Sequence, residues 1–359
     1  MSHASELSPD YVTARRRFLD AAHAANATVT SHVFPETGPD GEELAIDVAW
    51  VGPSDAATVI VIVSGTHGVE GFAGSACQHR WLAHRGPAPL PDGVAMMWIH
   101  AHNPFGFAWV RRVNEDNVDL NRNYLDGQAP PPNTGYDELA TALAPPDLSA
   151  EALEVADATL LDYAARHGMA AVQAAVSGGQ YDHPDGIFYG GAGPVRSQQV
   201  MRQILAEQAS GAERVVIVDL HTGLGEWGEV EVITDDTPDS AAYERIQAWW
   251  GRYPTGSTAS GDSVSAKLTG EWMRAAARWL APREVTAVAL EWGTVDTLSV
   301  LLALRADNWL HNSGDPTGPD AEPIKAQLRA AFAPEDPAWF ERVYGCFVDV
   351  VGAALTELT

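Results

Sequence analysis

The chain has 359 residues, and its 22 Lys and Arg residues against 48 Asp and Glu residues give a formal net charge of −26. So acidic a chain does not suit sequence-independent nucleic-acid binding, which needs a basic surface to displace counterions from phosphates. It does not suit docking on anionic lipid either, so neither nucleic acid nor a membrane is expected as a partner. Cys77 and Cys346 are too few for a disulfide framework, and no secretory signal pattern or membrane-length apolar run is present. We therefore expect a cytoplasmic protein.

The first elements predicted are a helix and a β-hairpin. Ser8 and Pro9 match an N-cap followed by proline at the first helical position, and predict a helix that runs to Asn26. Two β-rich runs follow, Thr28–Phe34 and Leu44–Val51, on either side of a Gly-Pro-Asp-Gly turn. This arrangement predicts two antiparallel strands.

Apolar runs typical of buried strands then alternate with helical patterns. The predicted strands are Thr58–Val63, Val94–His100, Arg214–Leu220 and Val285–Leu290. The predicted helices are Phe72–His84, Glu151–His167, Val195–Ser210, Ser240–Trp250, Ala266–Leu280 and Thr297–His311. Strands alternating with helices predict an α/β fold, with a twisted, mostly parallel sheet and helices on both faces. The hairpin makes the sheet mixed.

Two irregular stretches interrupt this alternation. Gln128–Pro146 is rich in proline, and residues 178–194 contain two Gly-Gly pairs. The tail from Ala321 to Thr359 has the pattern of two helices. Because there is no repeat and no clear linker, the sequence predicts one domain over residues 1–359, with an irregular insertion around 126–194 and a helical C-terminal tail.

Polar side chains follow each of the apolar runs. His67 and Glu70 come after the first run, Asn103 after the second, His221 after the third and Glu291 after the fourth. In open α/β sheets, ligands bind beyond the carboxyl ends of the strands. Two His and one Glu form a known ligand set for catalytic zinc, with a fourth position left for water. A further Glu supplies the base that such a water needs.

Each of these residues also has an ordinary structural explanation. His67 and Glu70 can be a chance pair, His221 can be a hydrogen-bonded histidine at a strand end, and Glu291 can belong to a structural ion pair. Their shared position at the ends of separate strands favours the joint metal site. A dinucleotide site is not expected, because Gly223-Leu-Gly-Glu-Trp-Gly228 precedes a predicted strand, Glu229–Thr234, where the fingerprint requires a helix.

A series of motifs in order along residues 58–293 carries a family resemblance. The motifs are His67-Gly-Val-Glu70, Asn103-Pro-Phe-Gly-Phe107, Arg112, Asp119-Leu-Asn-Arg-Asn123, His221 and Glu291. With these motifs the chain resembles the zinc carboxypeptidases (funnelins). The resemblance is to a bacterial branch related to deacylases of the aspartoacylase and succinylglutamate desuccinylase type.

The resemblance implies a metal centre with one Zn²⁺ per chain. His67, Glu70 and His221 would be the ligands. Asp119 would accept a hydrogen bond from a ligand imidazole, which fixes the tautomer of the ring and makes it a better ligand.

The resemblance also implies substrate-handling roles. Asn121 and Arg122 would grip a substrate carboxylate, for which a guanidinium fork has matching two-point geometry. Arg112, rather than Arg111, would stabilise the oxyanion. Glu291 would be the general base and then the acid. An ion pair of Arg122 with a neighbouring Asp is the structural alternative.

These roles predict a zinc-dependent hydrolase that cleaves an amide bond next to a free carboxylate, using a zinc-bound water activated by Glu291. A peptide C-terminus is the default substrate. The alternative is an N-acyl amino acid deacylase with a small closed pocket. A metal-binding module without turnover is a third possibility, although it would have no use for Glu291 or Arg112. Tyr181 and Tyr189 are candidates for a substrate-contacting tyrosine.

Overall fold

The computed structural model describes residues 6–86 and 88–358. Within them, one eight-stranded sheet has the strand order β1-β2-β4-β3-β5-β8-β6-β7. The strands are β1 (Thr28–Thr37), β2 (Glu43–Val51), β3 (Thr58–Ser64), β4 (Val94–His100), β5 (Arg214–Trp227), β6 (Val230–Thr234), β7 (Thr255–Ser257) and β8 (Glu284–Gly293). The predicted α/β fold with a mixed, mostly parallel sheet is confirmed.

Four parallel strands, β4, β3, β5 and β8, form the centre of the sheet. Every residue of β3 and β4 is buried, as expected for strands covered on both faces. The chain passes from β3 to β4 on one side and later from β5 to β8 on the other. The strand order therefore reverses between β3 and β5, where open α/β sheets have their ligand crevice.

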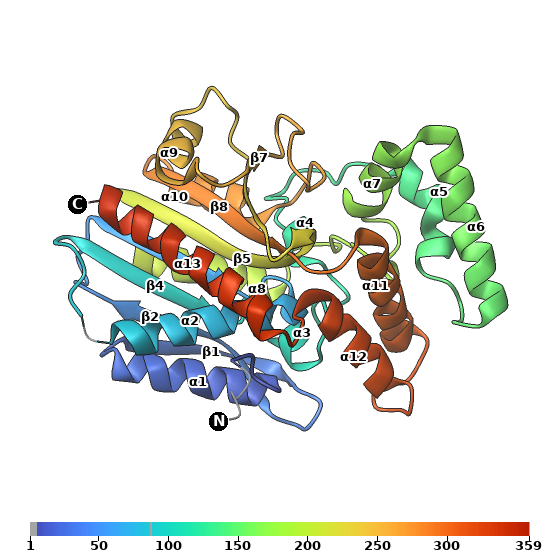
Figure 1. Ribbon diagram of the computed structural model, residues 1–359, viewed down its shortest axis with the longest axis horizontal. Helices are drawn as coiled ribbons and strands as arrows, with labels where there is room; N and C mark the ends of the chain where they lie inside the picture. Colours follow the sequence, from blue (N-terminus) through green and yellow to red (C-terminus); the bar gives the residue numbers. More distant parts are fainter. Residues whose placement is uncertain (1–5, 87, 359) are drawn as a thin grey trace.

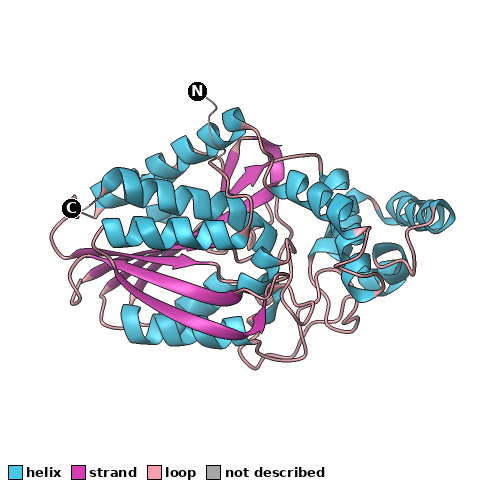
Figure 2. Cartoon of the chain, turned by 90° about the horizontal axis from the view of Figure 1, so that it is seen from below, coloured by secondary structure: helices cyan, strands magenta, loops and turns pink. Residues whose placement is uncertain are grey.

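Helices cover both faces of this sheet (Figures 1 and 2). One layer consists of α1 (Tyr11–Ala24), α2 (Gly71–Arg85), α9 (Ala241–Trp250) and α13 (Pro337–Glu357). The opposite layer contains α8 (Arg196–Ile204), its π-helical extension η2 (Leu205–Ala209) and α10 (Trp272–Leu280). Among the described residues, no helix combines the length and the apolar character needed to cross a membrane.

The remaining helices lie beside the sheet or at its end. Short elements border the crevice: η1 (Gly68–Glu70), α3 (Pro104–Ala108) and α4 (Leu120–Asn123). The insertion folds into α5 (Thr134–Leu143), α6 (Ala150–His167) and α7 (Met169–Ser177), which project away from the sheet, next to α11 (Thr297–Asn312) (Figure 1). The C-terminal tail forms α12 (Ala321–Phe332) and α13.

Two predicted helix starts are wrong, and each has a local cause. Helix α1 begins at Tyr11 because the carboxylate of Asp10, not Ser8, caps it by accepting from the amide of Thr13. Helix α10 begins at Trp272 rather than at Ala266. Gly270, just before it, has a φ of +78°, which no helical residue adopts.

Candidate metal centre

The turn after β3 places His67 and Glu70 in the crevice. Gly65 has a φ of +71°, a conformation that glycine adopts without steric cost. Gly68 packs so closely on α3 that an added Cβ would lie 2.0 Å from the carbonyl carbon of Gly106. The turn is therefore pressed against α3, and His67 directly precedes the short η1 helix that carries Glu70.

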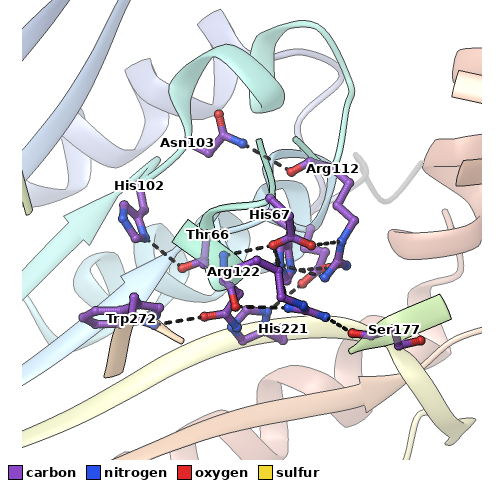
Figure 3. A network of polar contacts seen from close by, with 12 residues as sticks. Thr66, His67, His102, Asn103, Arg112, Arg122, Ser177, His221 and Trp272 are labelled. Carbon is purple, nitrogen blue, oxygen red and sulfur yellow. Dashed lines mark hydrogen bonds and ion pairs between the residues drawn. The ribbon is translucent and has the colours of Figure 1, made fainter. Parts of the chain in front are cut away.

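The structure brings the three predicted metal ligands together. One donor atom from each of His67, Glu70 and His221 lies within 4.8 Å of the other two. Nδ1 of His67 is 2.9 Å from Oε1 of Glu70, and Nδ1 of His221 is 3.0 Å from Oε2. All three side chains are buried. Figure 3 shows His67 and His221 in close-up.

Asp119 holds the far nitrogen of His67. Its Oδ1 is 3.1 Å from Nε2 of His67. The same oxygen accepts from the amide of Asn121 and so caps α4. Because Asp119 is fixed by this helix, it fixes the ring of His67 in turn. Burial tends to raise the pKa of Asp119, but the charges of Arg112 and Arg122 hold it well below its usual range.

His221 has a carboxylate partner that the sequence analysis missed. Nε2 of His221 lies 2.5 Å from Oδ2 of Asp219, two residues earlier on β5. Alternate residues of a strand face the same side of the sheet, so the spacing Asp-Leu-His was a usable signal. Each imidazole thus has a carboxylate on its distal nitrogen, an arrangement that leaves Nδ1 free to bind a metal.

Glu291 stands next to His221 on the neighbouring strand. The two residues are register partners in the parallel pair β5–β8, so their side chains leave the same face of the sheet. Oε1 of Glu291 accepts from the amide of Leu224 at 3.0 Å. Burial and the negative charge of Glu70 raise the pKa of Glu291 to about 8. A carboxylate tuned in this way exchanges a proton near neutral pH, as a general base and acid must.

Both His221 and Glu291 lie inside their strands rather than beyond the ends. Strand β5 continues to Trp227, and its pairing with β8 is irregular between Thr222 and Trp227. In both strands the run of apolar residues ends before the site residue, but the backbone stays extended beyond it.

Arg112 faces the metal centre and Arg111 does not. Arg112 donates from Nε to Asp119 at 3.0 Å and from Nη1 to Glu70 at 3.1 Å, and its Nη2 lies 2.8 Å from Nε2 of His67. Arg111 turns away and pairs with Asp307 on α11 at 3.3 Å. The predicted choice between these neighbours therefore agrees with the direction of their side chains.

Asn121 and Arg122 are buried at the edge of the centre. Oδ1 of Asn121 accepts from the amide of Trp272 at 3.3 Å, at the start of α10. Arg122 donates from Nη1 to the carbonyl of Asn121 and from Nη2 to the carbonyl of Ser177, at 3.1 and 2.6 Å (Figure 3). Its Nε has no hydrogen-bond partner among the described residues. Nη1 also lies 3.9 Å from Oδ1 of Asp119, so the ion pair with a neighbouring Asp is present as well.

The end of the insertion covers the two arginines. The ring of Phe188 lies 5.2 Å from the guanidinium carbon of Arg112 and 5.6 Å from that of Arg122. Phe188 has a φ of +56°, an outlier for a bulky residue that is typical of functional sites. The sequence carried no signal for this contact, because it joins residues far apart in the chain.

The other candidates have structural contacts outside the metal group. Asn103 caps α3 by accepting from Gly106 and donates to the carbonyl of Arg112. The hydroxyl of Tyr181 donates to the carbonyl of Arg122 at 2.7 Å. The carbonyl of Tyr189 accepts from the amide of Asp119 at 2.8 Å.

The atom types of the three donors and the ionised state of Glu70 both suit the binding of zinc. Two imidazole nitrogens and a carboxylate are the ligand types of open catalytic zinc sites. Burial alone would raise the pKa of Glu70, but His67 and His221 outweigh that effect and hold it below its usual value. Glu70 is therefore ionised, which a ligand must be.

Comparison with solved structures identifies the class of fold. Carboxypeptidase A from Helicoverpa armigera is 13% identical to this chain, with a TM-score of 0.50, over 93% of this chain and 76% of that one. Bovine thrombin-activatable fibrinolysis inhibitor is 10% identical, with a TM-score of 0.49, over 99% of both chains. Succinylglutamate desuccinylase from Chromobacterium violaceum is 14% identical, with a TM-score of 0.40, over 87% and 76%. The chain has a carboxypeptidase-like fold, which confirms the resemblance at that level.

The family follows from the sequence. The family described as "Protein of unknown function (DUF2817)" matches residues 7–345, and the chain belongs to it. No curated protein matches the sequence significantly. The chain therefore combines a carboxypeptidase-like fold with a buried His-Glu-His group that could hold a metal ion.

The ligand set leads to a prediction about metal content. His67→Ala and His221→Ala should each bind less zinc than the wild type, measured by elemental analysis after dialysis, because each removes one of three protein donors. His183→Ala is the matched control, since His183 pairs with Asp137 at 2.8 Å outside the site. Unchanged zinc in the two ligand variants, with circular dichroism showing folded protein, would contradict the assignment.

The raised pKa of Glu291 leads to a prediction about stability. Below the ordinary glutamate pKa, the side chain is protonated in both folded and unfolded protein. As pH rises to about 8, the unfolded chain loses this proton first, so the metal-free wild type should lose stability. Glu291→Gln should therefore gain stability relative to the wild type between pH 5 and pH 8, as measured by urea unfolding. Glu229→Gln, at an exposed position, is the control; a difference for Glu291→Gln that does not change with pH would contradict the prediction.

Proposed function

We propose that this protein is a zinc-dependent hydrolase that cleaves an amide bond next to a free carboxylate. The observation that carries the proposal is the placement of Glu291, with its raised pKa, beside the buried donor group of His67, Glu70 and His221. A zinc ion bound there would acidify a water molecule and polarise the substrate carbonyl.

The side chains around this group supply proton transfer, stabilisation of the oxyanion and binding of the substrate carboxylate. Glu291 accepts a proton from the attacking water and delivers it to the leaving nitrogen. Arg112, whose guanidinium donates to Glu70, stabilises negative charge as it develops on the substrate oxygen. Arg122, whose Nε has no hydrogen-bond partner among the described residues, holds the substrate carboxylate, and this binding orients the amide bond.

Two substrate classes fit this reaction. A peptide C-terminus and an N-acyl amino acid both place a carboxylate next to the amide bond. The cover over the arginines favours the smaller class: the side chain of Arg122 is 4% exposed, and Phe188 packs on it. An N-acyl amino acid deacylase is therefore the second candidate. Activity of the zinc form on a panel of C-terminal dipeptides and N-acyl amino acids decides between the two.

The role of Glu291 can be tested by turnover. Glu291→Gln should keep its zinc and lose about 10²- to 10⁴-fold in kcat on the best substrate of the panel, the usual contribution of a positioned acid–base group. Glu231→Gln, the register partner of Glu291 on β6, is a control close in space. Full activity of Glu291→Gln would remove it from the mechanism.

The role of Arg122 can be tested with paired substrates. Arg122→Ala should impair hydrolysis of substrates with a free carboxylate far more than that of the matching amides, because only the former lose a charge-assisted contact. The ratio of kcat/KM between the two substrates, compared with that of the wild type, is the measurement. Equal losses on both substrates would show that Arg122 does not bind the carboxylate.

A further inference from the structure

A chain of buried polar side chains lies behind His221. Asp219 accepts from Nε1 of Trp272 at 2.6 Å and from the hydroxyl of Thr66 at 2.9 and 3.0 Å. The same hydroxyl is 3.1 Å from Nδ1 of His102, and Nε2 of His102 is 2.6 Å from the hydroxyl of Tyr124. None of these side chains is more than 1% exposed. Figure 3 shows Trp272, Thr66 and His102 on the side of His221 away from Arg112.

The hydrogen-bonding direction along this chain follows from the number of hydrogens. An ionised Asp219 has none to give, so the single hydroxyl hydrogen of Thr66 points to Asp219. At its contact with His102, Thr66 must then accept, which requires a hydrogen on Nδ1. A neutral imidazole has one N–H only, so Nε2 of His102 is bare and accepts from Tyr124.

The opposite direction leaves groups without partners. If His102 carried its hydrogen on Nε2, the hydroxyl of Thr66 would have to turn to Nδ1, and Asp219 would lose a donor. The hydroxyl hydrogen of Tyr124 would then have no acceptor, because within the described residues its only hydrogen bond is with His102. A buried group left unsatisfied costs about 1 to 3 kcal/mol. The first direction satisfies every group.

The protonation states agree with this direction. Burial lowers the pKa of His102 to about 3, so its ring is neutral. Burial and the charge of Asp219 raise the pKa of Tyr124 well above its usual value, so its hydroxyl keeps its hydrogen. The backbone is strained where His102 is presented: Ala101, fully buried, has a φ of +61°. Such strain persists only where its surroundings impose it.

We propose that His102 is a positioning residue for the metal centre, held as the Nδ1–H tautomer by Tyr124. In this state Thr66 donates to Asp219, and Asp219 can act only as an acceptor. Asp219 lies 2.5 Å from Nε2 of His221, so Nδ1, which lies 3.0 Å from Glu70, is the ring nitrogen left to bind the metal. The proposal rests on the metal centre of the proposed function, but its first test needs no metal.

The first test reads the tautomer of His102 directly. In metal-free protein labelled with ¹⁵N-histidine, the two ring nitrogens and their couplings to ring protons distinguish the tautomers, and His102→Gln identifies the signal. We expect a neutral ring with hydrogen on Nδ1. A ring with hydrogen on Nε2, or a doubly protonated ring at neutral pH, would overturn the proposal whether or not the protein proves to be a hydrolase.

The second test measures zinc affinity by competition with a chelator. Thr66→Val removes the donor to Asp219 and should weaken zinc binding roughly tenfold, as loss of a partner behind a metal ligand does. Tyr124→Phe should weaken it by a smaller factor and shift His102 toward the other tautomer. Tyr11→Phe is the matched control, because Tyr11 is also buried and its hydroxyl bonds to Ala45, outside this chain.

The comparison of the two tyrosine variants separates positioning from general stability. Both remove one buried hydroxyl, so both are expected to lower thermal stability. Only Tyr124→Phe should change zinc affinity and the visible spectrum of the cobalt-substituted protein. Equal zinc affinities for Tyr124→Phe and Tyr11→Phe would reduce His102 to a structural residue and overturn the proposal. Absence of zinc binding in the wild type would instead refute the proposed function.

Discussion

The carboxylate of Glu70 is the group on which the site depends. Each of its oxygens lies against a different imidazole, His67 on one side and His221 on the other. A buried carboxylate without compensation costs several kcal/mol, and here the amide of Thr222 and the guanidinium of Arg112 supply additional donors. His67 lies on the turn that follows β3 and His221 lies within the neighbouring strand β5, so Glu70 also connects this turn to β5 at the point where the strand order reverses.

Two further carboxylates extend this arrangement outward. Asp119 and Asp219 each fix the far side of one imidazole, and each is held by its own surroundings, the start of α4 in one case and Trp272 in the other. The orientation of the ligands is thus set by elements that do not touch the metal. Such layered support is what a preorganised site requires, and it explains why so many polar groups are buried at this end of the sheet.

The sequence predicted those parts of the site that short-range patterns determine. The apolar runs located the central strands because burial on both faces leaves a continuous hydrophobic signature. His67, Glu70 and His221 followed from their place after such runs. Asp219 was missed although its spacing from His221 was visible, because it lies inside the predicted strand Arg214–Leu220 and not after it. The start of α10 was missed because a positive φ at Gly270, not a change in composition, delays the helix.

Contacts between distant segments could not be predicted in the same way. Nothing near Arg122 in the sequence indicates that its guanidinium meets the carbonyl of Ser177, or that Phe188 lies over it. These contacts depend on how the insertion folds back. Helix α6 matches a predicted helix, whereas α5 lies in the proline-rich stretch that the sequence predicts to be irregular, and α7 has no predicted counterpart. Their placement is a property of the whole fold, because it requires packing partners on α11.

The attachment of the insertion to Arg122 bears on how this scaffold can be re-engineered. Ser177 holds the guanidinium, and the hydroxyl of Tyr181 holds the main-chain oxygen of the same residue. A loop swap between relatives that exchanged residues 126–194 alone would remove the Ser177 acceptor and the Tyr181 donor, and would leave the guanidinium only its contacts with Asn121 and Asp119. The insertion and the Asp119–Asn123 segment therefore depend on each other, and an engineered exchange should include both segments or neither.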